Sequence, residues 1–342
     1  MAPSDANPDA PARIFTLTLN PCIDMGVEVE KVEPEHKLRC GTPRREPGGG
    51  GLNVTRAIAE IGGKSTAVFP AGGKTGDLLK FLVGFYCTGK ACDQRGVPVH
   101  APTRENVIVT ETSTGNQFRF NMPGAELNDD EAQACLEALV DGVGNMEGGG
   151  LAVISGSLPP GVEPPFVRTI IERVRAVGGR VVVDSSGPAL REALGMGVCM
   201  VKPNRRELAD AVGGMNPDES DHAVVGAAAI ELAQKHNITY VLVSMGGDGA
   251  VLAVKDGYAH CPAPRIDVRS ATGAGDSMVA AAVLAIERGC SPEDILRDGV
   301  AAGAAAAITP GTELLKRPDF ERLRGTLPTP TINRATPAKA KA

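Results

Sequence analysis

Short apolar runs that favour β-strands alternate with helical patterns along most of this 342-residue chain. The expected strands are Arg13–Leu19, Thr66–Pro70, Leu151–Ser155, Arg180–Asp184, Met200–Lys202, Tyr240–Ser244 and Ala250–Val254. The expected helices are Leu52–Ile61, Asp130–Val143, Pro165–Val177, His222–Lys235, Asp276–Arg288 and Pro292–Ile308. A repeated order of strand then helix is typical of parallel strands covered by helices on both faces. We therefore predict an α/β fold with a doubly wound, mostly parallel sheet between helices.

Two stretches depart from this alternation and read as antiparallel hairpins, more polar than the core strands. They are Met25–Val32 with Leu38–Arg45, and Asn106–Thr112 with Gln117–Asn121 around a Ser-Thr-Gly-Asn turn. We expect a small β-sheet lid, made of about residues 25–45 and 105–121, that stands off the main sheet.

The lid and the main sheet are expected to form one domain over residues 13–327. The two ends, residues 1–12 and 328–342, are rich in proline, alanine and charged residues. Segments of this composition bury too little apolar surface to fold, so both tails are expected to be disordered.

Composition argues against several classes of protein. The formal net charge is -6, without a block of lysine and arginine, which disfavours nucleic-acid and membrane partners. No apolar run reaches the roughly 18 residues of a membrane span, and the first residues lack the apolar core of a signal peptide. The eight cysteines are scattered without a CxxC pair, so we expect reduced thiols and neither a metal site nor a disulfide framework. These features favour a cytoplasmic enzyme with small-molecule substrates.

The segment Ala271–Ala281, ATGAGDSMVAA, places a glycine-rich turn and an aspartate at the start of a helix. Gly273 and Gly275 allow backbone N–H groups to face an anion, and the helix dipole adds its positive end. Asp276 could take a proton from a hydroxyl that attacks a phosphate, as phosphoryl transfer to an alcohol requires. The alternative is an ordinary helix N-terminus with a favourable acidic residue. On this segment alone the two interpretations weigh equally.

Polar or glycine-rich turns also follow the other expected strands. They are Asn20 and Asp24, the segment PGGGGLN at 47–53, Ser155–Ser157, Asp184–Gly187, Lys202–Asn204 with Glu207, and Ser244–Gly247. Ligands of a doubly wound sheet bind at the carboxyl ends of its strands. The sequence therefore predicts an active site at this edge.

Several of these residues have two interpretations. The four glycines before Asn53 allow a ligand to approach the backbone, or form a flexible loop, although the entropy of ordering them disfavours the loop. Glu207 pairs with Asn204 like a capping box, or faces phosphates through water bound to Mg²⁺. Lys37 and Arg104, in or beside the lid, could bind a substrate phosphate or be solvated surface cations.

Taken together, these motifs resemble the ribokinase-like (PfkB) carbohydrate kinases over about Ile14–Leu315. The resemblance is carried by TLTLNPCID (16–24), HKLRCGTP (36–43), EPGGGGLNVTRA (46–57), FPAGGKTGD (69–77), QFRFNMPG (117–124), VISGSLPPGV (153–162), VVDSSG (182–187), VKPNRREL (201–208), VSMGGDGA (243–250) and TGAGDSMVAA (272–281). Fructose-1-phosphate and tagatose-6-phosphate kinases of this family typically carry a lysine inside the glycine cluster. Here Gly50 and Gly51 stand there, as in the bacterial minor-type 6-phosphofructokinases.

The resemblance implies a ribokinase-like fold whose β lid forms a homodimer interface. It implies phosphorylation of fructose-6-phosphate at its 1-hydroxyl by MgATP, giving fructose-1,6-bisphosphate. The nearest alternative is a kinase of tagatose-6-phosphate or fructose-1-phosphate. An alternative of another class is a non-catalytic sugar-phosphate sensor, which the intact Asp276 and its glycines disfavour.

Residue by residue, the resemblance makes Asp276 the general base and the amides of Gly273, Ala274 and Gly275 the anion hole. The sugar side would be formed by Asp24, Gly49, Gly50 and Asn53 at the hydroxyls and by Lys37, Arg104 and Ser157 at the phosphate. The nucleotide side would be formed by Lys202, Asn204, Ser244, Gly246 and Gly249, with Glu207 organising Mg²⁺ through water. A loop that could bind K⁺ through carbonyls comprises Ser270, Thr272, Ala306, Thr309 and Gly311.

Two segments depart from the family pattern. Residues 80–100 carry Gly84, Gly89 and Gly96 where relatives have an amphipathic helix and a short strand, so we expect altered packing near Arg104. Glu313 stands beside the K⁺ loop where the relatives commonly carry arginine.

Overall fold

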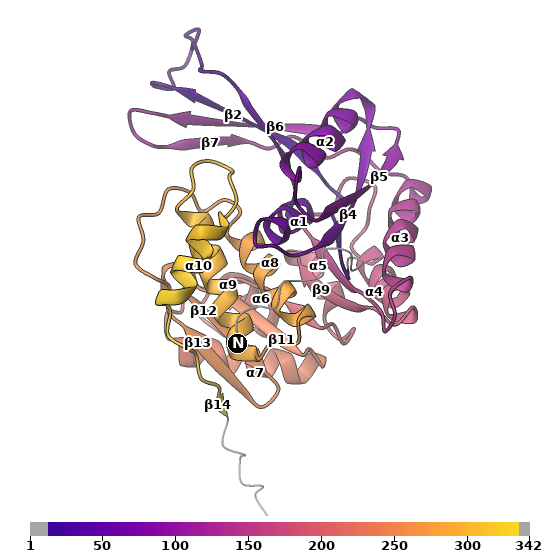
Figure 1. Cartoon of the computed structure of the whole chain (residues 1–342), viewed down its shortest axis with the longest axis vertical. Helices are drawn as coiled ribbons and strands as arrows, with labels where there is room; N and C mark the ends of the chain where they lie inside the picture. The colour runs from indigo at the N-terminus through magenta and orange to yellow at the C-terminus, as the bar shows by residue number, and fades with distance from the viewer. Residues whose placement is uncertain (1–12, 335–342) are drawn as a thin grey trace, which may run out of the picture.

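The computed structural model describes residues 13–334 and has a ten-stranded sheet at its centre (Figure 1). The strand order is β14-β13-β12-β11-β10-β9-β8-β1-β4-β5, and the part from β11 to β5 is parallel throughout. The antiparallel strands β12 to β14 extend one edge. The predicted α/β fold with a mostly parallel sheet is confirmed.

All the predicted core strands form. Four have the expected bounds: β8 Leu151–Ser155, β9 Arg180–Asp184, β11 Tyr240–Ser244 and β12 Ala250–Val254. The other three, β1 Ile14–Leu17, β4 Ser65–Gly72 and β10 Met200–Val201, differ at their ends. Every residue of β1, β4 and β8 is buried, which explains their continuous apolar sequences.

Alternate residues of the strands contribute to two separate cores. In β9, Val182 belongs to the core beneath α1, α8, α9 and α10, while Val181 and Val183 belong to the core beneath α3 to α7. The helices on the first face are α1 Gly50–Glu60, α8 Ala274–Glu287, α9 Pro292–Ala307 and α10 Arg317–Thr326. Those on the second are α3 Asp129–Gly144, α4 Phe166–Ala176, α5 Gly187–Ala193, α6 Arg205–Val212 and α7 His222–His236.

The expectation for residues 80–100 is wrong, because this segment forms both a helix and a strand. Helix α2 spans Gly73–Tyr86 and β5 spans Cys92–Val99, paired in parallel with β4. Leu79 and Val83 of α2 are buried against Phe69 of β4, and this packing outweighs the poor helix propensity of glycine. Gly89 lies in the intervening turn with φ 74°, a conformation that favours glycine.

The expectation about cysteines is wrong at one pair. Cys87 and Cys92, at the two ends of the turn between α2 and β5, form a disulfide with a Cα–Cα distance of 5.7 Å. The six other cysteines are free, and those at 22, 135, 199 and 261 are buried.

The lid is a four-stranded sheet in the order β3-β2-β6-β7, and it projects from the main domain beside α2 (Figure 1). Its strands are β2 Cys22–Val29, β3 Arg44–Gly48, β6 Arg104–Glu111 and β7 Gln117–Phe120. The two hairpins join through parallel pairing of β2 with β6. The expected strand at 38–45 is wrong, because the register that pairs Gly48 with Cys22 places β3 later, directly before α1.

Only part of the two expected tails lies within the described residues. The expected tail 1–12 and residues 335–342 of the expected tail 328–342 lie outside the described residues. Asn333–Arg334, within the second tail, form β14 and pair with β13, Gly257–Cys261. Across residues 13–334, no helix is long and apolar enough to cross a bilayer.

The buried aromatic at the centre of β4 gives a test of the packing between β4 and α2. Phe69 is 0% exposed, whereas Phe81 on the outer face of α2 is 66% exposed. We predict that Phe69→Ala lowers the free energy of unfolding by about 3–5 kcal/mol, the loss typical of a buried phenylalanine. The matched change Phe81→Ala should cost less than about 0.5 kcal/mol. Denaturant unfolding measures both, and equal losses would contradict the assigned packing.

Candidate active site

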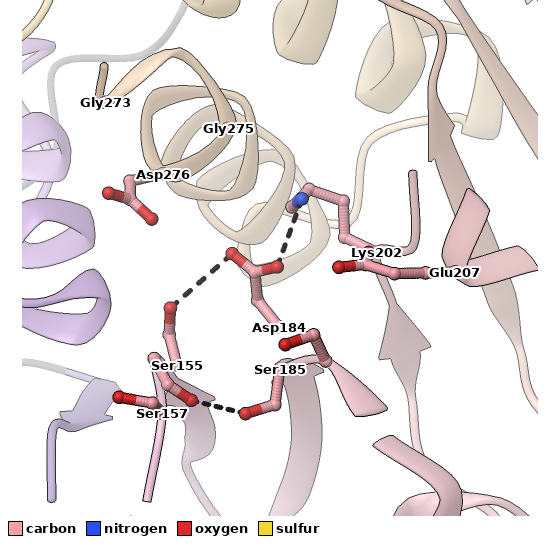
Figure 2. Close-up of a pocket in the computed structure, with 11 residues that line it drawn as sticks. Ser155, Ser157, Asp184, Ser185, Lys202, Glu207, Gly273, Gly275 and Asp276 are labelled. Carbon is pink, nitrogen blue, oxygen red and sulfur yellow. Dashed lines mark hydrogen bonds and ion pairs between the residues drawn. The ribbon is translucent and has the colours of Figure 1, made fainter. Parts of the chain in front are cut away.

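A polar cavity of about 330 Å³ lies where the carboxyl ends of β8, β9 and β10 meet the start of α8. Its lining comes from four places along the chain and comprises Ser155, Gly156, Ser157, Asp184, Ser185, Ser186, Lys202, Glu207, Gly273, Gly275 and Asp276. Figure 2 shows the side chains of Ser155 and Lys202 directed at Asp184, with Asp276 on the other side of the cavity. The predicted edge of the sheet therefore carries the cavity.

The start of α8 offers unpaired backbone donors to this cavity. Gly273 caps the helix with φ 75°, and a Cβ there would lie 2.7 Å from Leu314 Cδ2. Glycine therefore satisfies both the backbone conformation and the lack of space. The first N–H groups of a helix have no partner within it, so those after Gly273, with the positive end of the helix dipole, offer donors to which an anion could bind.

Asp276 lies in the first turn of α8, and its Oδ2 accepts a hydrogen bond of 2.9 Å from Nδ2 of Asn53. Burial, together with the negative charge of Asp184, raises the pKa of Asp276 to about 6. The hydrogen bond from Asn53 and the charges of Lys202 and Arg56 oppose that rise. A carboxylate with this pKa is mostly ionised at neutral pH and still basic enough to accept a proton in a reaction.

Lys202 and Asp184 form an ion pair inside the cavity, with 3.1 Å between Nζ and Oδ1. Burial opposes the charge of Lys202, but the charge and hydrogen bonding of Asp184 leave its pKa above the ordinary value. The Ser155 hydroxyl lies 3.5 Å from the other carboxylate oxygen of Asp184 (Figure 2). The cavity therefore holds a fixed cation beside two carboxylates, those of Asp184 and Asp276.

Both interpretations of Glu207 fit the structure. Its Oε2 accepts from the Asn204 N–H at 2.8 Å, while Asn204 Oδ1 accepts from the Glu207 N–H at 2.9 Å, which completes a capping box at α6. Glu207 also lines the cavity beside Lys202. Within residues 13–334 no cluster of three or more His, Cys, Asp and Glu side chains could hold a metal ion. Glu207 and Asp184 suit Mg²⁺, which retains several waters and needs few protein ligands.

A second, more apolar cavity of about 620 Å³ adjoins the first and shares Gly275 with it. It is lined by Ser244, Gly246 and Gly249 from the β11–β12 turn, by residues 263–266, and by Met278, Val300 and Ala304. Asn204 lies next to Ser244 through a β-bridge. Gly249 has φ 93°, and a Cβ there would lie 2.0 Å from the Cys261 oxygen. Of the predicted nucleotide residues, Ser244, Gly246 and Gly249 line this cavity, whereas Lys202 lines the polar cavity and Asn204 lines neither.

The residues predicted for the sugar hydroxyls lie at the junction of the lid and α1. Asp24 Oδ1 accepts from Asn106 Nδ2 at 2.9 Å and from the Cys22 thiol at 3.2 Å. Gly49 has φ 112°, and a Cβ at Gly50 would lie 2.2 Å from Ser155 Oγ. This close approach of the glycine loop to β8 explains why no side chain occupies position 50.

The three residues predicted at the sugar phosphate lie in different settings. Ser157 lines the polar cavity and accepts from Asn20 Nδ2 at 3.0 Å. Arg104 donates to the carbonyls of Asn20 at 3.0 Å, Pro21 at 3.4 Å and Met122 at 3.0 Å, so it connects the lid to the β1–β2 link. Lys37 is exposed on the segment between β2 and β3 and does not line the polar cavity.

In the suggested K⁺ loop, side-chain hydroxyl groups donate hydrogen bonds to backbone carbonyls of the loop. Ser270 donates to the Gly311 carbonyl at 2.7 Å, and Thr309 donates to the carbonyls of Ala306 at 2.7 Å and Glu313 at 2.8 Å. Thr272 is bonded to Arg119 of the lid. Glu313 forms ion pairs with Arg44 of the lid and with Lys316. The unusual glutamate therefore fastens this loop to the lid.

Sequence reasoning assigned no role to several residues of the site. Asp184 was visible as the last residue of a buried strand, the position at which ligands of such sheets bind. Arg119 reaches Thr272 beside the anion site, and Arg56 bonds Asn53. The contacts of both arginines depend on tertiary structure, and no local pattern indicates them.

Over residues 17–318 the sequence matches the family described as pfkB family carbohydrate kinase. The ATP-dependent 6-phosphofructokinase isozyme 2 of Escherichia coli strain K12 is 40% identical over 317 residues, covering 91% of this chain and 97% of that protein. A crystal structure of phosphofructokinase-2 from E. coli in complex with substrates and products has a TM-score of 0.84 at 40% identity, covering 92% of this chain and 99% of that chain. Arabidopsis thaliana ribokinase, with a TM-score of 0.67 at 19% identity over 92% of this chain and 99% of that chain, shares the fold.

The raised pKa of Asp276 predicts a pH-dependent effect on stability. Because its pKa of about 6 in the folded protein exceeds the ordinary 3.8, the folded state binds this proton more tightly. Stability from that proton is present below about pH 4 and lost as the pH rises through about 6. Relative to wild type, Asp276→Asn should therefore become more stable by about 1 kcal/mol between pH 5 and pH 8.

Denaturant unfolding at the two pH values measures this change. The matched control is Asp93→Asn, which alters an exposed carboxylate on β5 and should shift stability equally at both. A stability difference for Asp276→Asn that does not depend on pH would show that its carboxylate is not buried as described.

Proposed function

This chain belongs to the pfkB family of carbohydrate kinases, and we propose that it phosphorylates fructose-6-phosphate at the 1-hydroxyl with MgATP, giving fructose-1,6-bisphosphate and ADP. The observation that carries the proposal is the position of Asp276. Its carboxylate stands beside the free N–H groups of α8, where the polar cavity meets the larger apolar one at Gly275. A base and an anion site at the junction of two cavities suit phosphoryl transfer between two bound substrates.

The cavities suggest how the substrates are arranged. The apolar cavity would take the nucleoside, and the phosphates would extend past Gly275 so that the γ-phosphoryl group meets the first N–H groups of α8. Lys202 would balance the charge of the phosphates. Mg²⁺, held through water by Glu207 with Asp184, would neutralise further phosphate charge.

The transfer itself needs one proton acceptor. The 1-hydroxyl oxygen forms a bond to the γ-phosphorus while the bond from that phosphorus to the ADP oxygen breaks, and the hydroxyl proton passes to Asp276. Since Asn53 bonds Oδ2, the remaining oxygen, Oδ1, is free to accept the proton. The N–H groups of α8 stabilise the charge on the transferring group without reorganisation.

A second candidate substrate is fructose-1-phosphate or tagatose-6-phosphate. The 1-phosphofructokinase of Bacillus subtilis is 31% identical over 302 residues, and it supports this alternative less than the 40% relative supports fructose-6-phosphate. The glycine at position 50, packed on Ser155, also favours the 6-phosphofructokinase pattern. A non-catalytic sugar-phosphate sensor would bind these sugars without consuming ATP.

We predict that wild type consumes ATP fastest with fructose-6-phosphate in a coupled assay across a panel of phosphosugars. Asp276→Asn should lower kcat by about 10²- to 10⁴-fold, the usual contribution of a general base, while calorimetry shows ATP binding retained. Glu163→Gln, at an exposed position outside both cavities, is the matched control and should leave kcat unchanged. A variant at 276 that keeps more than about a tenth of wild-type turnover would exclude the role, and wild-type binding without turnover would support the sensor.

Arg104 provides a test of phosphate recognition. A guanidinium has five N–H donors, and three donate here to carbonyls, so one on each terminal nitrogen remains for a phosphate. Arg104→Ala should lower kcat/KM for fructose-6-phosphate by about 10- to 150-fold, the contribution of a charge-assisted hydrogen bond, and far less for free fructose. Equal losses for both sugars would mean that Arg104 only supports the lid.

We also propose a homodimer through the lid. Aligned residues of β2, β6 and β7 form an apolar face, with Met25, Val107 and Phe120 in one row and Val27, Val109 and Phe118 in the next. Phe120 remains 51% exposed in the single chain, and such a face on a sheet with free edges needs a partner. The E. coli relative has been solved in a tetrameric inhibited form.

We retain the cytoplasm as the expected location on compositional grounds.

Light scattering after size exclusion at micromolar concentration tests this assembly. We expect a dimer or larger for wild type. The double variant Phe118→Asp and Phe120→Asp should shift to monomer, because burying two carboxylates in an apolar dimer interface is unfavourable. Phe81→Asp, which alters another exposed aromatic, should leave the mass unchanged. A fully active wild-type monomer would contradict the proposal.

Potassium binding at the loop of Ser270, Thr309 and Gly311 stays a prediction. The structure of the E. coli relative in complex with potassium supports it. In this chain a bound cation would compete with the hydroxyl groups of Ser270 and Thr309 for the loop carbonyls.

A further inference from the structure

Arg56 lies on α1, one helical turn after Asn53, and it does not line the polar cavity. It is only 8% exposed and borders a separate hollow of about 130 Å³ between α1, β3 and residues 313–316. A buried arginine needs hydrogen-bond acceptors for its N–H groups and a negative partner for its charge.

The guanidinium of Arg56 is held on several sides. Nη1 donates to the Pro47 carbonyl at 2.8 Å and to Asn53 Oδ1 at 3.3 Å, and Nη2 donates to Glu46 Oε1 at 3.2 Å. Glu46, on lid strand β3, is 2% exposed. The guanidinium carbon also lies 4.7 Å from the centre of the Tyr86 ring. The position of Arg56 is therefore fixed by the lid, α1 and α2 together.

Asn53 lies between this arginine and Asp276. Its Oδ1 faces Arg56 and its Nδ2 donates to Asp276 Oδ2 at 2.9 Å. The two ends of an amide are nearly identical in shape, but arginine can only donate and an ionised carboxylate can only accept. The chemistry of the two neighbours therefore allows a single orientation of the amide.

We infer that Arg56 is a positioning residue for the transfer: it holds the Asn53 amide so that the NH₂ group, and not the oxygen, faces Asp276. This inference rests on the proposed role of Asp276 as the base. A donor directed at the carboxylate favours its ionised, proton-accepting form, whereas a carbonyl oxygen in the same place would repel it.

The charges around Asp276 agree with this role. Burial and Asp184 raise its pKa, while the hydrogen bond from Asn53 and the charges of Lys202 and Arg56 lower it. The charged groups that face Asp276 from the neighbouring elements are therefore Asp184 of β9, Lys202 after β10 and Arg56 of α1. Changing Arg56 alone leaves the first two in place.

The test compares the pH profiles of wild type, Arg56→Met and Arg56→Lys. Arg56→Met should move the acidic limb of kcat/KM up by about half to one pH unit, the size expected for one lost hydrogen bond. Its activity loss should then be about two- to fivefold larger at pH 6 than at pH 8, with KM for ATP unchanged. Arg56→Lys keeps a charge beside Glu46, so it should fold even if Arg56→Met does not, but a single ammonium group lacks the two separated nitrogens with which the guanidinium reaches Glu46 and Asn53 together. It should show the same direction of shift.

A double variant separates positioning from a direct effect of charge. If Arg56 acts through Asn53, adding Arg56→Met to Asn53→Ala should shift the acidic limb by less than about 0.3 pH unit beyond Asn53→Ala alone. Additive shifts would overturn the inference and assign the effect to the charge of Arg56. Arg173→Met on α4, which breaks an exposed ion pair with Glu137 on α3, is the matched control and should leave the profile unchanged.

A readout that does not depend on turnover distinguishes failure of this inference from failure of the proposed function. In protein labelled with ¹³C at aspartate carboxyls, the Asp276 signal is identified by its loss in Asp276→Asn. Its titration should move upward in Arg56→Met by about half to one pH unit even if no sugar phosphate is turned over. An unchanged titration would overturn the inference, whatever the activity assay shows.

Discussion

The burial of α8 is the constraint on which the rest of the site depends. Ten consecutive residues, Ser277–Ile286, are buried between the sheet, α1 and α9. Half of them are alanine or serine, so the helix packs closely and cannot tilt without losing contacts along its whole length. Its first turn is consequently held at the edge of the sheet, with its donors directed at both cavities. The positions of Asp276 and the anion site are thus a by-product of core packing.

The charged groups around Asp276 also determine how the site can work. Asp184 disfavours ionisation of Asp276, while Lys202 and Asn53 favour it. The same aspartate pairs with Lys202, so a phosphate that engages the lysine would weaken that pair and alter the field at the base. On the proposed role of Asp276, substrate binding and proton transfer would therefore be coupled electrostatically, in a cavity where such interactions are poorly screened.

Sequence patterns predicted the parts of the fold that depend on continuous apolar runs. Strands such as β8 and β11 were predicted with their exact bounds, because residues buried on both faces give an unambiguous signal. Helix α2 was not predicted, because its glycines have low helix propensity. Its packing on Phe69, which offsets that low propensity, cannot be seen in the sequence. The motif residues of the glycine turns converge as expected. Arg56 and Arg119 could not be assigned, because their roles depend on partners distant in sequence.

Strand β3 passes into α1 through only Gly49, which has φ 112°. The lid and the helix that carries Asn53 are therefore joined by continuous backbone, without a flexible linker between them. Any swing of the lid must bend this joint and pull on the first turn of α1. On the proposed role of Asp276, opening of the lid would therefore also displace the Asn53 amide from the carboxylate it faces, and transfer of phosphate to water would be disfavoured while the sugar site is open.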